Sequence, residues 1–124
     1  MERVEGYWRQ FEREEDVPEG RPPLSALEWS LPWPRPDAGW SGRDVFLARL
    51  DMAEAKAEQV GYRGYSYCRL CRQQNGSMEF ELGLWRWPEG FRHYVAEHDV
   101  PPSPDFEAFL ASELPDKEGG GTIT

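Results

Sequence analysis

The sequence contains no long apolar run and very few cysteines, histidines and lysines. No segment approaches the ~20 apolar residues of a membrane-spanning helix, and no apolar core follows the charged start Met1-Glu2-Arg3. We therefore expect a soluble cytoplasmic protein. Basic residues are almost all arginine, with Lys56 and Lys117 as the only lysines. This bias favours a GC-rich genome and hence a bacterial source.

Positive charge is also scarce, because 14 lysines and arginines face 23 acidic residues and the net charge is −9. Proteins that bind phosphate backbones release counterions through clustered basic residues, which this composition does not favour. A local nucleic-acid-binding patch remains an alternative, since several arginines lie near the cysteines and histidines. They are Arg63, Arg69, Arg72, Arg86 and Arg92.

The length of 124 residues suits one domain with a small core. Aromatic residues make up 14%, and the 12 glycines and 11 prolines indicate many loops. We expect an α+β fold, a single domain over residues 1–115 and a flexible tail over residues 116–124. A structural zinc can add an apparent ~10–16 kcal/mol to such a small domain.

All cysteines and histidines lie in two short segments, Cys68-Arg69-Leu70-Cys71 and His93-Tyr94-Val95-Ala96-Glu97-His98. Two cysteines two residues apart, followed by two histidines four residues apart, can place four ligands around one Zn²⁺. The sequence therefore predicts one structural zinc held by Cys68, Cys71, His93 and His98. A disulfide, a redox pair and simple packed thiols are the alternatives, although a polar turn, rather than a helix, follows the cysteines.

The residues between the two pairs predict a short hairpin and a helix. Apolar and charged side chains alternate over residues 78–82, Gly83 allows a reversal, and a second alternating run follows at residues 85–87. Asn75-Gly76 is typical of a tight turn. Pro88 favours the first position of a helix that must end by Val100, before two prolines.

Residues 62–98 resemble the zinc-finger class with two cysteine and two histidine ligands, in the order knuckle, antiparallel hairpin and ligand-bearing helix. The resemblance implies a structural metal. The spacer between the second cysteine and the first histidine is longer than the roughly twelve residues of DNA-reading fingers. His93 and His98 would lie roughly 140° apart on a regular helix, so His98 is expected where the last turn unwinds.

The flanking segments predict three helices and one irregular arm. Apolar spacing predicts helices over residues 1–16, 42–60 and 103–114, with Ser41 and Ser103 as capping residues of the last two. Residues 17–41 are too rich in proline for a helix or a central strand. We expect these helices to pack around the zinc module.

The arm over residues 17–41 carries tryptophans that either pack on their own domain or anchor a partner. The candidate partner-binding residues are Trp29, Trp33, Arg35 and Trp40. No residue spacing predicts a catalytic site, so we expect no enzyme. The sequence favours a protein-protein interaction or adaptor module, with nucleic-acid binding, or inhibition by imitating nucleic acid, as alternatives.

Overall fold

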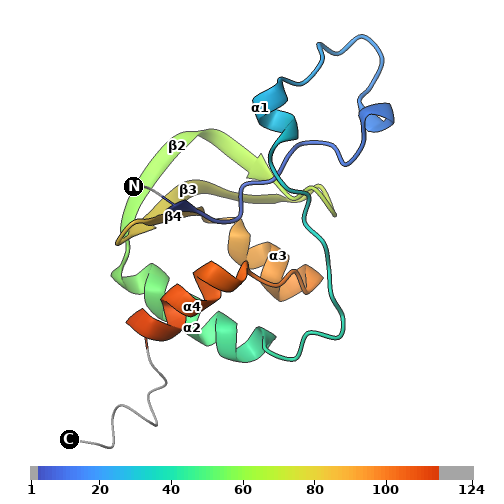
Figure 1. Ribbon diagram of the computed structural model, residues 1–124. Coiled ribbons are helices and arrows are strands. Elements are labelled where there is room, and N and C mark those ends of the chain that lie inside the picture. The colour runs from blue at the N-terminus through green and yellow to red at the C-terminus, as the bar shows by residue number, and fades with distance from the viewer. Residues whose placement is uncertain (1–2, 115–124) are drawn as a thin grey trace, which may run out of the picture.

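The computed structural model describes residues 3–114, without the side chains of residues 62 and 63. The tail predicted over residues 116–124 lies outside this range. The elements in chain order are β1 (Arg3–Val4), the 3-10 turn η1 (Glu14–Asp16), α1 (Ala26–Trp29), α2 (Arg43–Lys56), β2 (Glu58–Tyr67), β3 (Gln74–Leu82), β4 (Trp85–Pro88), α3 (Phe91–His98) and α4 (Pro104–Glu113) (Figure 1). Among the described residues, no helix has the length and apolar character to cross a membrane.

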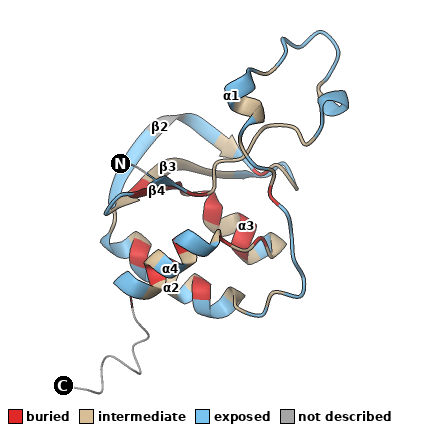
Figure 2. Ribbon diagram, viewed as in Figure 1, coloured by how far each residue is buried: buried red, intermediate tan, exposed pale blue. Residues whose placement is uncertain are grey.

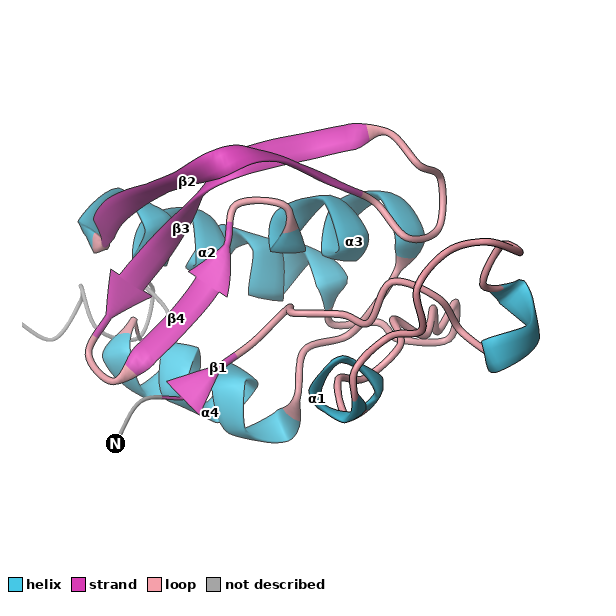
Figure 3. Ribbon diagram, turned by 90° about the horizontal axis from the view of Figure 1, so that it is seen from above, coloured by secondary structure: helices cyan, strands magenta, loops and turns pink. Residues whose placement is uncertain are grey.

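One sheet with the strand order β1-β4-β3-β2 covers the helices α2, α3 and α4 (Figure 3). Strands β2, β3 and β4 are antiparallel neighbours, whereas β1 runs parallel to β4. The register pairs Phe80 with Trp87, so the apolar residues of both strands share the face that the helices cover. The mixed helix and strand content confirms the α+β class.

The core lies between the sheet and the three helices, where Figure 2 shows the buried stretches, and β2 is largely exposed. Large rings fill it, and Phe106 of α4 packs against Trp85, Trp87 and Phe91 at centroid distances of 4.9, 5.2 and 5.8 Å. Its other buried members are Phe46, Leu50, Ala53, Phe80, Val95, Leu110 and Leu114. The aromatic composition thus supplies a contiguous core.

The predicted hairpin is present as β3 and β4, which reverse at Gly83 with a φ of 60°. Two local predictions were wrong. Asn75-Gly76 lies inside β3 and forms no turn, because the chain reverses earlier, at the cysteines that connect β2 to β3. Pro88 ends β4, and α3 begins only at Phe91.

The helix predicted over residues 1–16 is wrong. Strand β1 takes up Arg3 and Val4, and the chain then runs without regular structure to η1. Gly6 explains the break, because its φ of 82° is left-handed and a Cβ there would lie 2.8 Å from the ring of Phe91. Backbone pairing with β4 therefore prevails over the apolar spacing.

Helices α2 and α4 lie close to their predicted ranges, whereas α1 was not predicted. The expectation that residues 17–41 contain no helix was wrong over Ala26–Trp29, where α1 forms a single turn and the Ser25 side chain caps it by accepting the N–H of Glu28. The helix predicted over residues 42–60 ends at Lys56, because the next residues pair with β3 as strand β2. The predicted cap by Ser41 was wrong, because Gly42 is the N-cap residue and no side chain caps this helix. Helix α4 matches its prediction, and the Ser103 side chain accepts the N–H of Phe106.

Candidate metal centre

The β2–β3 connection and helix α3 bring Cys68, Cys71, His93 and His98 together. One potential ligand atom from each residue lies within 4.8 Å of all the others, which is close enough to hold a metal ion. The cysteines lie at the turn of the hairpin, and both histidines lie on α3, whose N-terminus follows β4. The order knuckle, hairpin and helix therefore holds for this part of the chain.

Backbone hydrogen bonds shape the loop that carries the cysteines. The Cys68 N–H donates to the Gln73 carbonyl (2.8 Å), and the Arg72 N–H donates to the Cys68 carbonyl (2.9 Å). Arg72 has a φ of 66°, a left-handed conformation that turns the chain back into β3. The amides of Leu70 and Cys71 lie 3.3 and 3.4 Å from the Cys68 sulfur, where they can donate to a thiolate.

The burial of Cys68 disfavours its thiolate, which is the form that binds a metal ion. Burial raises the pKa of the Cys68 thiol, and the Cys71 and Leu70 amides offset this only in part. A bound metal ion reverses this balance, because its charge deprotonates a coordinating thiol outright. Both cysteines are free, and Cys71 is exposed, so the structure contains no disulfide between them.

The two imidazoles fit the role of neutral ligands. The Nε2 atom of His93 lies 3.3 Å from the Cys71 sulfur, and the ring centroids of His93 and His98 are 5.1 Å apart. Burial, together with the nearby His98, lowers the pKa of His93, which favours the neutral form that binds metals. The Nε2 atom of His98 is buried without a hydrogen-bond partner in the described chain. Such an atom costs about 1–3 kcal/mol, and coordination would satisfy it.

The end of α3 explains how two histidines five residues apart reach one point. His98 is the last residue of α3, and Asp99 has a left-handed φ of 55°. The N–H groups of Asp99 and Val100 both donate to the carbonyl of Tyr94, which closes the helix. The expected helix end by Val100 is confirmed.

Tyr94 and Arg69 connect the metal centre to the N-terminal segment, a role that sequence reasoning did not assign. The Arg69 N–H donates to the hydroxyl oxygen of Tyr94 (2.7 Å), whose ring packs edge-on against Trp8 at 5.4 Å. The Arg69 guanidinium donates to the carbonyls of Tyr67, Trp8 and Arg9 at 2.8, 3.2 and 3.2 Å. An arginine between two candidate ligand cysteines was the only local signal.

The candidate partner-binding residues of the arm lie apart from the metal ligands. Trp29, Trp33 and Trp40 are all half-buried. Trp40 packs toward the core, with its ring 6.2 Å from that of Phe46. Trp33 and Arg35 line a hollow of about 360 Å³ that Pro101 and Pro102 also border. Trp29 lines a different hollow, of about 600 Å³.

Comparison with known proteins adds no relative: no protein family, curated protein or solved structure matches this chain. The site must therefore be interpreted from its own chemistry. Two sulfur and two imidazole nitrogen atoms form the donor set, and all four come from the protein. Such a set can bind one metal ion and leaves no position for a substrate in a tetrahedral site.

Proposed function

We propose that the protein is a small zinc-binding module that acts by binding another protein, with zinc as a structural ion. The convergence of Cys68, Cys71, His93 and His98 carries this proposal. Zinc is the favoured ion because two thiolates and two imidazoles in a tetrahedral set suit it better than calcium, magnesium or manganese, which prefer oxygen.

The donor set supports a structural rather than a catalytic metal. Catalytic zinc usually has three protein ligands and an open position for water. With both histidines as ligands, as proposed, neither is left as a proton shuttle. The proposal therefore assigns the chain no reaction of its own. Its role is to present a surface.

The surface around Trp33 and Arg35 supports the protein-binding part of the proposal. Trp33 is half-buried beside a hollow, and the Arg35 side chain is 70% exposed while it pairs with Glu12 at 3.4 Å. Tryptophan and arginine are enriched among residues that dominate binding energy. Trp40 is less suited, because its ring packs toward Phe46.

Metal analysis tests the zinc part of this proposal. Protein purified without added zinc should contain about one equivalent, because four ligands form one site. A Cys71→Ser variant should lose most of it, whereas the control variant Asp44→Ser, at an exposed position of α2, should retain it. A preparation without metal, but with a Cys68–Cys71 disulfide, would contradict the proposal.

Nucleic-acid binding is the second candidate, favoured by the charges of Arg69 and Arg72. Neither forms an ion pair with a described residue. By contrast, Arg86 pairs with Glu81 (2.9 Å) and Arg92 pairs with Asp51 (2.8 Å), which reduces the patch anticipated from the sequence. Titration with single-stranded and duplex DNA at low salt separates the two functions, because phosphate contacts give salt-dependent binding.

A further inference from the structure

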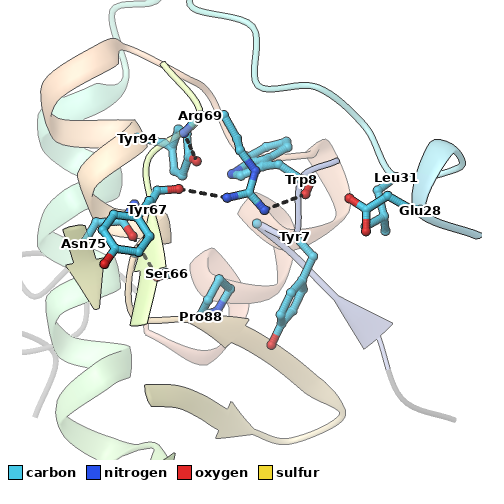
Figure 4. A pocket seen from close by; sticks show the side chains of 12 residues that line it. Tyr7, Trp8, Glu28, Leu31, Ser66, Tyr67, Arg69, Asn75, Pro88 and Tyr94 are labelled. Atoms are coloured by element: carbon cyan, nitrogen blue, oxygen red, sulfur yellow. Dashed lines mark hydrogen bonds between the residues drawn. The ribbon is translucent and has the colours of Figure 1, made fainter. Parts of the chain in front are cut away.

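A small pocket opens at the end of β2, beside the connection that carries the metal ligands (Figure 4). Its volume is about 200 Å³, below the roughly 300–1,000 Å³ of pockets for small-molecule ligands. Its apolar and aromatic lining consists of Tyr7, Trp8, Leu31, Tyr67, Pro88 and Tyr94. The size and lining fit one bulky side chain of a partner.

The charges inside this pocket offset one another. Arg69 and Glu28 are the charged residues that line it. A carboxylate oxygen of Glu28 accepts the Gln10 N–H at 2.9 Å, and the Arg69 guanidinium donates to backbone carbonyls, as the dashed lines of Figure 4 show for Tyr67 and Trp8. A neutral, aromatic pocket favours an uncharged side chain over a charged one.

A second hollow, of about 530 Å³, adjoins the pocket and is positively charged. The two share Ser66, Tyr67 and Arg69 as lining residues. Arg21 and Arg72 also line the hollow, and no carboxylate does. Their guanidinium carbons lie 5.3 and 6.0 Å from the ring centroid of Phe11, which both contact as cations.

The carboxylate of Glu28 lines the adjoining pocket, and no carboxylate lines this hollow itself. Arg21, Arg69 and Arg72 form no ion pair with any residue in the described part of the chain. Arginines without an ion pair are unusual in a protein whose net charge is −9. Charge complementarity therefore favours binding of an anionic group of a partner in this hollow.

The free edge of β2 adds a backbone surface to the two hollows. β2 is the last strand of the sheet order, and its residues 65–67 lie at the pocket and the hollow. Among the described residues no strand pairs with its outer edge. An exposed edge strand can pair with an extended peptide through main-chain hydrogen bonds.

We propose that this groove, formed by the pocket, the hollow and the edge of β2, binds an extended acidic peptide segment of the partner protein. One bulky apolar side chain fills the pocket, and acidic side chains contact Arg21 and Arg72. This inference rests on the proposed function, because it specifies the chemistry of the partner. It adds a site separate from Trp33 and Arg35.

The groove favours a peptide over single-stranded nucleic acid. Nucleic-acid binders need a long basic track with free aromatic faces for the bases. Here the ring of Phe11 is covered by the guanidinium groups of Arg21 and Arg72. A net charge of −9 also repels a long polyanion more than a short acidic segment. A strand edge offers hydrogen bonds that a peptide backbone can use.

The test begins with the zinc-loaded full chain and a displayed library of random linear peptides. Enriched peptides are expected to combine acidic residues with one bulky apolar residue. Their affinity is then measured by fluorescence anisotropy. Arg21→Gln and Arg72→Asn should each weaken binding about tenfold, which is the effect of losing one charge-assisted hydrogen bond. Tyr67→Ala should weaken it as well, since Tyr67 lines both hollows.

Two features make these variants informative. Arg72 has a φ of 66°, and asparagine adopts this left-handed conformation readily, so Arg72→Asn removes the charge with little effect on the loop. Arg3→Gln is the matched control, because it removes the same charge from β1, at the opposite edge of the sheet. The Arg3→Gln variant should bind the enriched peptides with the affinity of the wild type.

Several results would overturn the proposal. They are the absence of enriched peptides, enrichment of basic peptides, and equal binding by Arg72→Asn and the wild type. Binding of an oligo(dT) probe, lost in Arg21→Gln and Arg72→Asn, would assign the groove to nucleic acid instead. Zinc content measured on the same preparations keeps the two proposals apart: zinc-loaded protein that binds no peptide refutes only this inference, whereas metal-free folded protein refutes the zinc module.

Discussion

Replacing Glu54 by glutamine should stabilise the protein at alkaline pH and have little effect at acid pH. Glu54 lies on α2, and one of its carboxylate oxygens accepts the Trp87 indole N–H at 3.0 Å. Burial raises the pKa of Glu54 to about 7, although the hydrogen bond from Trp87 opposes this. Asp51 raises the pKa further, and Arg92 lowers it.

The direction of the pH effect follows from the proton count. An ordinary glutamate has a pKa of 4.5, so between 4.5 and about 7 the folded chain holds the proton that the unfolded chain has released. The free energy of unfolding therefore falls as the pH rises through this interval. At 1.36 kcal/mol per pH unit the full loss is about 3 kcal/mol, and solvent screening of the partly exposed carboxylate reduces it to about 1–2 kcal/mol.

Glu54→Gln keeps an oxygen that can accept the Trp87 N–H and removes the charge. Urea unfolding, followed by tryptophan fluorescence, should show a gain of about 1–2 kcal/mol at pH 8 and almost none at pH 5. Zinc ligation also depends on pH, but it affects both proteins equally and cancels in the difference. Glu58→Gln, on exposed β2, is the control for net charge. If the difference in unfolding free energy between Glu54→Gln and the wild type were the same at pH 5 and pH 8, the raised pKa of Glu54 would not be its cause.

Three further predictions concern the metal, the first loop and the arm. Zinc chelation, or Cys71→Ser, should increase amide exchange first in the β2–β3 connection and α3, because the four candidate ligands lie on these two segments. Gly6→Ala should lower the free energy of unfolding by about 2–4 kcal/mol, because it combines a left-handed φ with a clash against Phe91. The control Gly20→Ala also has a left-handed φ, of 85°, but faces open space, so the same urea titration should show only the smaller cost of the backbone conformation. Trp33→Ala should abolish partner capture in a pull-down and leave zinc content unchanged; loss of zinc would contradict this.

The sequence predicted the features that depend on neighbours along the chain. The spacing of Cys68 and Cys71, and of His93 and His98, was sufficient to identify four residues that the structure brings together. Alternation of apolar and charged residues located β3, because a strand exposes alternate side chains to its two faces. Ser103 located the start of α4 in the same way, through a local cap.

Predictions from the sequence were wrong where contacts between residues far apart in the chain determine the structure. Arg3 and Val4 form a strand only because β4 offers a parallel edge, and two residues are too few for a recognisable alternation. The helical spacing of the following aromatic residues was misleading, because Gly6 adopts a left-handed conformation against Phe91. The link from Arg69 to Trp8 and Tyr94 was equally invisible, since these residues lie far apart in the sequence.

Arg69 connects the candidate metal centre to the proposed peptide groove. It lies between the two cysteines, its backbone N–H donates to Tyr94, and its side chain holds Trp8 and Tyr67 at the pocket. Zinc loss should therefore weaken the binding of an enriched peptide as well as increase the mobility of the β2–β3 connection. Because coupling between two ligands is reciprocal, saturating peptide should raise the affinity for zinc by the same factor, measured by competition with a chelator. Equal zinc affinity with and without a bound peptide would show that the ion only stabilises the fold.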